Sequence, residues 1–362
     1  MPLDRLTVPH IPGIITQDEV LQTAHSIAAV QCKNGMIPWF ANGHSDPWNH
    51  VEAAMALSAT GMWEEATRAY EWLVSSQLPD GSWFNYYTDA IGVVDQRIDT
   101  NVCAYIAVGT WHHYLVTGDL GFLEWMWKVL DRAVAFVLRY QTNSGTVLWS
   151  VDPDGRSGRY ALLTGSSSIY HALRCAIACA DALGYDRDDW KAAARMLYHS
   201  LSHPDDGFEP KRDFAMDWYY PILCGALKGE AAARRLKRDW DTFVMDGLGV
   251  RCVSTGPWIT AAETAECAIA LSKMASGTVN PTGGTDPGAD PFGRSARDLI
   301  LWSRNLRRED GSYWTGMVYP EQVTFPVGES TTYTSAAIIL AVDSLREDSS
   351  TNRVFSPASQ LH

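Results

Sequence analysis

Basic residues are scarce in this sequence. Its 362 residues include 29 Lys and Arg against 42 Asp and Glu, which gives a formal net charge of −13. Nucleic acids and anionic membrane surfaces are bound by clustered cations, so we expect neither as a partner. The sequence also lacks a run of 18 apolar residues, so no membrane-spanning helix is predicted.

Motifs for metal binding, redox chemistry and export are missing as well. The seven cysteines form no Cys-x-x-Cys pair, and there is no His-Glu-x-x-His motif or EF-hand loop. We therefore expect reduced core thiols, no bound metal and no cofactor. Residues 1–13 lack the charged and apolar segments of a signal peptide. These features predict a cytoplasmic protein, and they leave its oligomeric state open.

Aromatic residues, in contrast, are abundant. There are 15 Trp, 15 Tyr and 10 Phe, and many lie in polar, glycine-containing stretches. They have two interpretations. They fill a large core, or they line a cleft for a flat, hydroxylated ligand such as a sugar.

Apolar residues recur at helical spacing along almost the whole chain. Within residues 119–141, for example, Phe122, Met126, Val129 and Ala133 form one apolar face. The pattern predicts about twelve helices, near residues 17–32, 47–60, 63–77, 98–117, 119–141, 164–183, 188–201, 214–226, 229–240, 258–275, 291–307 and 329–346. Only small hairpins are expected besides, near residues 146–151 and 249–254.

Long and short connections alternate between these helices. This alternation is typical of six helical hairpins that close into a ring, and four Gly-bearing turns followed by Trp support the repeat (residues 31–39, 77–83, 141–149 and 308–314). The predicted fold is therefore an all-α (α/α)6 barrel over residues 1–345. The segment from Ser276 to Pro291 is expected to be a flexible loop, and residues 346–362 a disordered tail.

The long loops of such a barrel meet at one mouth, beside the N-termini of the inner helices. Aromatic faces stack on sugars, carboxylates and Arg bind hydroxyls, and two carboxylates can supply acid and base catalysis. We therefore expect a carbohydrate ligand, bound by Trp39, Asp46, Trp48, His50, Trp83, Tyr86, Asp99, Ser167, His171, Trp218, Tyr219, Arg251, Trp258, Glu263, Trp314 and Tyr333. Asp46 and Asp99 also fit a purely structural role as helix N-caps.

Four short segments resemble the glucoamylase family, whose members are (α/α)6-barrel inverting glycosidases. The segments are residues 114–122, Gly165–Ser168, Gly256–Trp258 with Glu266, and Pro320–Gln322 with residues 332–337. The last one is similar to the passage that carries the general base of that family. The resemblance thus implies Glu321 as the base, with Glu329 as the alternative.

The general acid of that family is a glutamate just before Gly-Ser-Ser. Residues 160–164 of this sequence are Tyr-Ala-Leu-Leu-Thr and contain no acid. Asp152 or Asp154 can supply it from the same loop, and Asp99 or Asp217 from neighbouring hairpins. Asp217 stands among aromatic residues, where a carboxylate needs a partner or a raised pKa. The expected function is an inverting glycoside hydrolase acting on a glucan or another glycoside.

Two alternatives remain open. The Gln…Asp-Gly-Ser-Trp turns also resemble the toroids of terpene cyclases and protein prenyltransferases. The Asp-x-Asp-Asp acid of class II cyclases is absent, however, and Tyr333 stands where a prenyltransferase needs a zinc-binding His. The missing acid also leaves room for an inactive glycan-binding protein.

Overall fold

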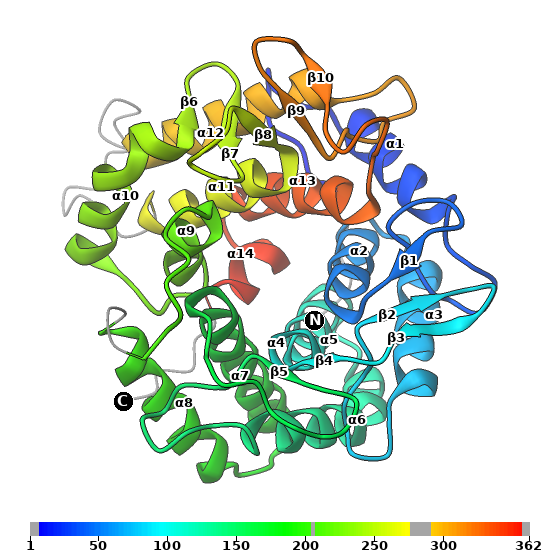
Figure 1. Ribbon diagram of the computed structural model, residues 1–362. Coiled ribbons are helices and arrows are strands. Elements are labelled where there is room, and N and C mark those ends of the chain that lie inside the picture. Colours follow the sequence, from blue (N-terminus) through cyan, green and yellow to red (C-terminus); the bar gives the residue numbers. More distant parts are fainter. Residues whose placement is uncertain (1–6, 204–206, 276–290, 357–362) are drawn as a thin grey trace.

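Two concentric rings of helices make up the molecule. The computed structural model describes residues 7–203, 207–275 and 291–356. The inner ring consists of α2 (Pro47–Ala59), α5 (Ile106–Thr117), α7 (Leu163–Leu183), α9 (Ala215–Leu223), α11 (Ala261–Ala275) and α13 (Thr332–Ser344) (Figure 1). Each inner helix contacts the next, and α13 closes the ring on α2. The prediction of an (α/α)6 barrel is confirmed.

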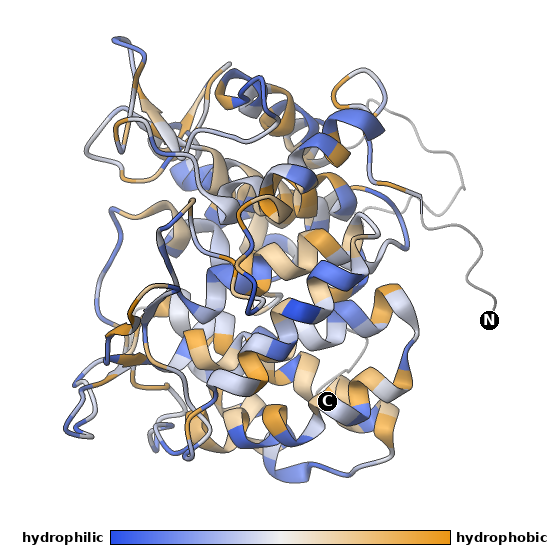
Figure 2. Ribbon diagram, turned by 90° about the vertical axis from the view of Figure 1, so that its right-hand side faces the viewer, coloured by the Kyte–Doolittle hydropathy of each residue, from blue (hydrophilic) through white to orange (hydrophobic). Residues whose placement is uncertain are grey.

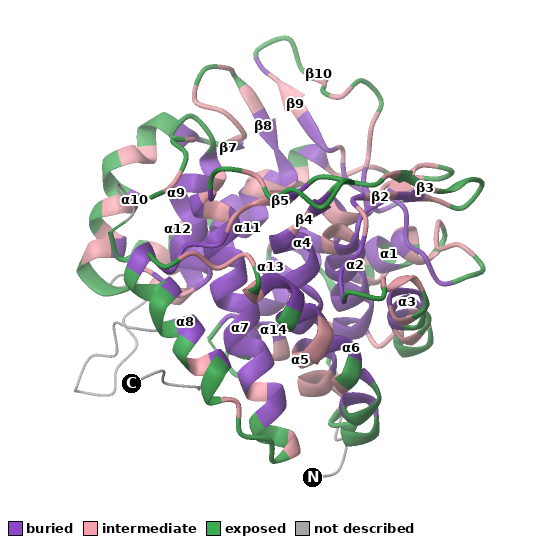
Figure 3. Ribbon diagram, turned by 60° about the horizontal axis from the view of Figure 1, so that its bottom comes forward, coloured by how far each residue is buried: buried purple, intermediate pink, exposed green. Residues whose placement is uncertain are grey.

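The outer ring carries the other half of each hairpin. It consists of α1 (Gln17–Ala28), α3 (Trp63–Ser76), α6 (Leu120–Leu138), α8 (Asp188–Leu201), α10 (Gly229–Phe243) and α12 (Pro291–Ser303). Figure 3 shows the inner helices largely buried and the outer helices exposed on one face. None of the helices in the described ranges is long and apolar enough to cross a bilayer.

The repeated turns are structural devices that join neighbouring hairpins. The side-chain amides of Gln31, Gln77 and Gln141 each donate to the glycine carbonyl four residues on and to a carbonyl of the next outer helix. Gly35 and Gly81 adopt positive φ, and a Cβ there would lie 2.0 and 2.2 Å from carbonyl oxygens of α3 and α6. The internal repeat is therefore explained by packing between hairpins.

Helix boundaries differ from the prediction by a few residues at several places, and two of these differences lie near the end where the strands gather. The helix expected over 98–117 is interrupted at Tyr105, which separates α4 (Thr100–Ala104) from α5. The helix expected from residue 258 begins at Ala261, because Trp258–Thr260 forms strand β8. This strand pairs with β7 (Gly249–Arg251) and with β9 (Gly316–Val318).

The strands form small sheets over one end of the barrel. One sheet has the order β10 (Val323–Thr324), β9, β8, β7, β6 (Val244–Met245). A second pairs β1 (His44–Ser45), β2 (Tyr86–Thr88) and β3 (Gly92–Asp95), and a third pairs β4 (Ile98–Asp99) with β5 (Ser150–Val151). In side view these segments project together from the end where the inner helices begin (Figure 2). That end is called the mouth below. The hairpin predicted near residue 250 is present as β6 and β7, whereas the strand near residue 150 pairs with the distant β4. The five-stranded sheet was not predicted.

The opposite end of the barrel is closed by the C-terminal segment. Residues 350–354 form α14 (Ser350–Val354), which lies inside the ring and contacts α5 and α13 (Figure 1). Val354 and Phe355 are buried. The expected disordered tail is therefore wrong for residues 346–356, because burial of these apolar side chains and pairing with inner-helix side chains fix the segment. Residues 357–362 and the expected loop at 276–290 lie outside the described residues.

Candidate active site

A cavity of about 340 Å³ opens at the mouth, over the centre of the ring. Five carboxylates from α2, α11 and the start of α4 face it, together with aromatic and amide side chains. The lining residues are Trp39, Asp46, Trp48, Asn49, Glu52, Asn85, Tyr86, Asp99, Asn101, Val102, Met216, Trp258, Thr260, Ala262, Glu263, Glu266, Thr315 and Tyr333.

Asp46 is held rigidly at the start of α2. Its side chain caps the helix by accepting from the backbone N–H of Asn49 at 3.0 Å, and it also accepts from Trp39 Nε1 and Asn49 Nδ2, both at 2.7 Å. Burial nevertheless raises the pKa of this carboxyl above its ordinary value, because desolvation outweighs these donors. Asp46 is thus both a helix cap and an oriented acid of the cavity.

Two glutamates form the floor. Glu52 lies six residues beyond Asp46, roughly 9 Å deeper at 1.5 Å per helical residue. Its Oε1 accepts from Trp48 Nε1 at 2.9 Å and from the Tyr105 hydroxyl at 3.3 Å. Glu266 on α11 accepts from the Tyr219 hydroxyl.

These floor carboxyls repel one another. Burial raises the pKa of Glu52 to about 7, with a further rise from the charges of Asp46 and Glu263. Burial and the charge of Glu52 likewise hold the pKa of Glu266 well above its ordinary value. Like-charged carboxyls in one dry site do not all ionise, so the floor retains protons at neutral pH.

Two further carboxylates stand near the rim. Asp99 directly precedes α4, and burial raises its pKa to about 6 despite the nearby guanidinium of Arg97. Glu263 lies in the first turn of α11, one turn nearer the mouth than Glu266. Asp46 and Glu263 therefore stand at the mouth on two different inner helices, with α13 between them in the ring.

Aromatic side chains line the cavity between these carboxylates. Trp39 meets Tyr333 edge-on at 5.0 Å and Tyr86 at 6.1 Å, and Trp48 stacks on Tyr105 at 5.1 Å. Aromatic faces of this kind pack on the C–H faces of sugars, while the acids and amides bind hydroxyls. The lining suits a neutral, hydroxylated ring.

The structure brings half of the expected binding residues together. The cavity is lined by Trp39, Asp46, Trp48, Tyr86, Asp99, Trp258, Glu263 and Tyr333. Tyr219 lies behind it and supports Glu266.

The other expected binding residues point elsewhere. His50 and Trp83 are core residues that hydrogen-bond to the carbonyls of Ala69 and Leu73. Ser167 is fully buried in α7. The remaining four are fixed outside the cavity: His171 by Val354 of the closed end, Trp218 by Arg235, Arg251 by Thr242, and Trp314 by Arg308 over its ring.

None of the four expected catalytic carboxylates lines this cavity. Glu321 and Asp152 are exposed in turns, and Glu329 lines a neighbouring groove behind Trp39, where it accepts from Thr315. Asp217 accepts from the Thr164 hydroxyl at 2.6 Å and lines a groove on the outer side of α9. Motif likeness suggested Glu321 and Glu329, and loop position suggested Asp152 and Asp217. The register of the inner helices, however, decides which side chains face the cavity.

Sequence reasoning did not assign a role to the floor carboxylates. Glu52 and Glu266 were visible as acids near the start of the helices predicted over 47–60 and 258–275. The sequence signal for these two glutamates is a charged residue at an inward-facing position of a helix that is otherwise rich in alanine, as in α2 and α11.

A relative of established activity is similar over nearly the full length of this chain. It is the MMP endo-(1,4)-3-O-methyl-α-D-mannosidase of Mycolicibacterium hassiacum, which is 43% identical over 348 residues, covering 96% of this chain and 92% of the relative. The chain belongs to the same family of glycoside hydrolases as this mannosidase. An uncharacterized glycosyl hydrolase of Methanocaldococcus jannaschii is 28% identical over 181 residues, covering 45% of this chain and 25% of that protein. No family model matches.

Solved structures agree on the fold. A glycosidase variant in complex with glucose superposes with a TM-score of 0.70 at 14% identity, covering 91% of this chain and 96% of that one. A D-mannose isomerase gives a TM-score of 0.65 at 10% identity, covering 90% and 96%. The same toroid thus occurs in a glycosidase and in a D-mannose isomerase. Within the described part of the chain, no three His, Cys, Asp or Glu side chains converge as metal ligands, so the zinc set of a prenyltransferase is not found there.

Proposed function

We propose that this glycoside hydrolase is an endo-acting mannosidase that cleaves α-(1,4) bonds inside a 3-O-methylated mannan with inversion. The observation that carries the proposal is the mouth cavity flanked by Asp46 and Glu263 on two inner helices. The mannosidase relative supports the substrate, since it acts on a methylated mannan and matches 96% of this chain.

In this mechanism the two rim carboxyls act on the scissile bond. Asp46, whose pKa burial raises, donates its proton to the glycosidic oxygen as the bond to C1 breaks. Glu263 removes a proton from a water, and the resulting hydroxyl attacks C1 from the opposite face. The leaving sugar departs as an alcohol, the product is the β-anomer, and proton exchange with solvent restores both carboxyls.

The rim pair fits this role better than the floor pair. A chain cut in its middle must cross the mouth, so its scissile bond lies at the level of Asp46 and Glu263. Glu52 and Glu266 lie deeper, below the level at which a chain crosses the mouth, and accept from Trp48, Tyr105 and Tyr219 there. They bind the hydroxyls of the sugar that enters the cavity.

An apolar platform beside the cavity supports a methylated substrate. Trp258 meets Phe325 edge-on at 4.9 Å, and its Nε1 donates to the Phe325 carbonyl at 3.0 Å. The Trp258 ring packs directly on Gly316, where a Cβ would lie only 2.3 Å from Trp258 Nε1. Phe325 is 48% exposed. A methyl ether gains from contact with these rings, whereas a hydroxyl left there without a partner costs about 1–3 kcal/mol.

Product analysis tests the proposal. The protein is incubated with a 3-O-methylated α-(1,4)-mannan, with the unmethylated chain and with amylose. We expect medium-length oligosaccharides to appear first from the methylated mannan, slower cleavage of the unmethylated chain, and intact amylose. Release of glucose from amylose, or an intact methylated mannan, would contradict the proposal.

A further inference from the structure

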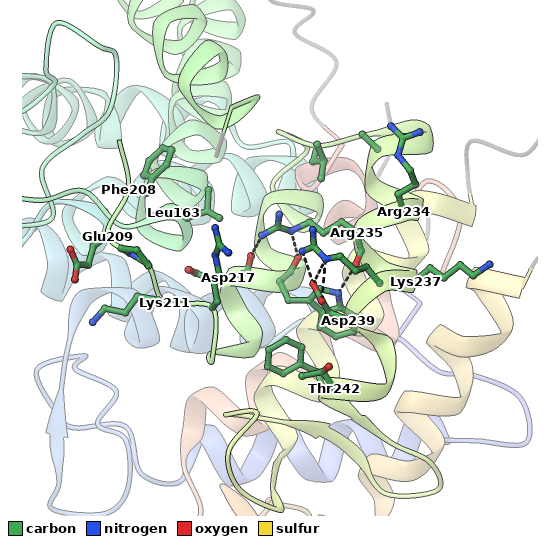
Figure 4. Close-up of a pocket in the computed structure, with 17 residues that line it drawn as sticks. Leu163, Phe208, Glu209, Lys211, Asp217, Arg234, Arg235, Lys237, Asp239 and Thr242 are labelled. Carbon is green, nitrogen blue, oxygen red and sulfur yellow. Dashed lines mark hydrogen bonds and ion pairs between the residues drawn. The ribbon is translucent and has the colours of Figure 1, made fainter. Parts of the chain in front are cut away.

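A cavity larger than that of the mouth lies elsewhere on the molecule. It is a groove of about 1200 Å³ between α10 and residues 208–212, on the outer side of α9 (Figure 4). Met216 faces the acidic cavity, whereas the next two residues, Asp217 and Trp218, line this groove. The two sites are therefore neighbours separated by α9.

The charge of the groove is opposite to that of the molecule. Six cationic side chains line it against three acidic ones, in a chain of net charge −13. The cationic ones are Lys211, Arg212, Arg234, Arg235, Lys237 and Arg238. Figure 4 shows Lys211 on one wall and the labelled cations of α10 on the other.

The three acids of the groove are Glu209, Asp217 and Asp239, which leave it a formal excess of three positive charges. Asp217 accepts from Thr164, and burial raises the pKa of its carboxyl. Asp239 is paired with Arg238 at 2.6 Å. Arg234 pairs with Glu230, but both side chains are largely exposed, and exposed pairs of this kind are readily exchanged for another anion.

The arginine side chains on the groove face of α10 are close enough to repel one another. Arg234 and Arg238 are four residues apart on one face of α10, together with Arg235. Like charges at this spacing destabilise a helix. Arg235 is fixed by donating to the carbonyls of Asp217 and Trp218, at 2.6 and 2.9 Å, which anchors the arginine-rich face of α10 against α9. A repulsive face held in place this way is typical of a binding site.

We infer that this groove binds an oxyanion-bearing ligand, a phosphate ester or a polycarboxylate. Guanidinium groups donate forked hydrogen bonds that match such oxygens, and Lys adds a mobile point charge from the facing wall. Apolar side chains of Leu163 and Leu227 line the same groove and can cover the rest of an organic anion. The site is distinct from the sugar cavity, whose carboxylates repel anions.

Calorimetry on the full chain tests this inference, with pyrophosphate and citrate as the two anionic probes and mannose as the neutral probe. We expect pyrophosphate or citrate to bind, with an affinity that falls as the ionic strength rises. The double variant Lys211→Ala/Arg234→Ala should lose at least tenfold in affinity. Binding of pyrophosphate alone identifies a phosphate site, and binding of citrate alone a carboxylate site.

A matched control removes the same charge elsewhere. Lys128 on α6 and Arg195 on α8 are exposed and lie outside the groove. The double variant Lys128→Ala/Arg195→Ala should bind like the wild type. The inference is overturned if neither anion binds the wild type at millimolar concentration, or if both double variants lose affinity equally. Hydrolysis by all variants confirms that they are folded.

Discussion

The two ends of the barrel place titratable side chains of the inner helices in opposite situations. At the mouth, Asp46 and Glu263 face an open cavity. At the closed end, His112 and His171 are covered by the C-terminal segment, where they contact the Thr351 hydroxyl and the Val354 carbonyl. Burial lowers the pKa of both histidines to about 3.

The two ends therefore have different roles: the carboxyls of the mouth are available for catalysis, and the buried histidines of the closed end contribute to stability. The histidines of the closed end are neutral and packed, so they hold the C-terminal segment in place. The carboxyls of the mouth are acids without a covering segment in the described structure. Burial raises the pKa values of Asp46 and Asp99. The comparison predicts that substitutions at the mouth change turnover, whereas substitutions at the closed end change stability.

The largest effect is expected at the rim of the mouth. Asp46→Asn and Glu263→Gln should each lower kcat/KM by about 10²–10⁴, because each removes one proton-transfer step. Asn is also a good N-cap, so the free energy of unfolding of Asp46→Asn should change by less than about 1 kcal/mol. Kinetics on the methylated mannan and chemical denaturation measure the two effects.

Glu321→Gln is the matched control for these variants. Glu321 is the base implied by the glucoamylase resemblance, and the structure places it in an exposed turn. It should retain nearly full activity. A loss at Glu321 as large as that at Glu263 would contradict the assignment of the mouth cavity.

A substitution at the closed end should lower stability and leave turnover unchanged. Phe355 is 4% exposed and packs on His171 with ring centroids 4.9 Å apart. Phe355→Ala should lower the free energy of unfolding by about 3–5 kcal/mol through the lost contacts and the cavity left behind. Its kcat/KM, measured where the variant is folded, should match the wild type. A folded but inactive Phe355→Ala protein would break the separation between the two ends.

At the floor of the mouth, a carboxyl of the cavity also makes the stability of the protein depend on pH. The folded-state pKa of Glu52 is about 7 against an ordinary 4.5, so the folded state binds the proton more tightly than the unfolded state. This carboxyl therefore favours folding below pH 4.5, and its contribution is lost as the pH rises to about 7. Glu52→Gln should be more stable than the wild type at pH 8 by about 1–3 kcal/mol. Thermal unfolding at pH 4 and pH 8 checks this, and an equal shift at both pH values would refute it.

The smallest effect is expected on the apolar platform. Phe325→Ala should lower kcat/KM on the methylated mannan by about three- to tenfold, in line with the worth of one aromatic contact. Cleavage of the unmethylated chain should be unchanged. Phe214→Ala, at another exposed phenylalanine, is the control. Equal losses on both substrates would show that Phe325 does not distinguish methylated sugars.

The sequence predicts the barrel because periodicity and loop length are local signals that repeat six times. It also places Trp39, Asp46 and Glu263 at the mouth, since each stands at or just before the start of an inner helix. The wrong disorder prediction for the tail has a different origin. A polar segment with only Val354 and Phe355 as apolar anchors is ordered by the barrel that receives it, and that partner is invisible in local composition.

The choice of catalytic residues likewise depends on tertiary packing, which local sequence signals do not reveal. His50 and Glu52 are two residues apart on α2, yet the first hydrogen-bonds to an outer-helix carbonyl and the second faces the cavity. Helical register separates them, and register within the ring follows from packing rather than from residue type. Motif likeness to glucoamylases indicated the fold and the reaction class, but the positions it implied for the carboxylates lie outside the cavity.

The stereochemistry of the first product tests the account most directly. Proton NMR is recorded during early cleavage of the methylated α-(1,4)-mannan by the wild type, with Glu263→Gln as the parallel sample. An inverting pair formed by Asp46 and Glu263 predicts that the new reducing end appears first as the β-anomer, and that Glu263→Gln forms little product over the same time. Initial release of the α-anomer, or undiminished cleavage by Glu263→Gln, would contradict the account.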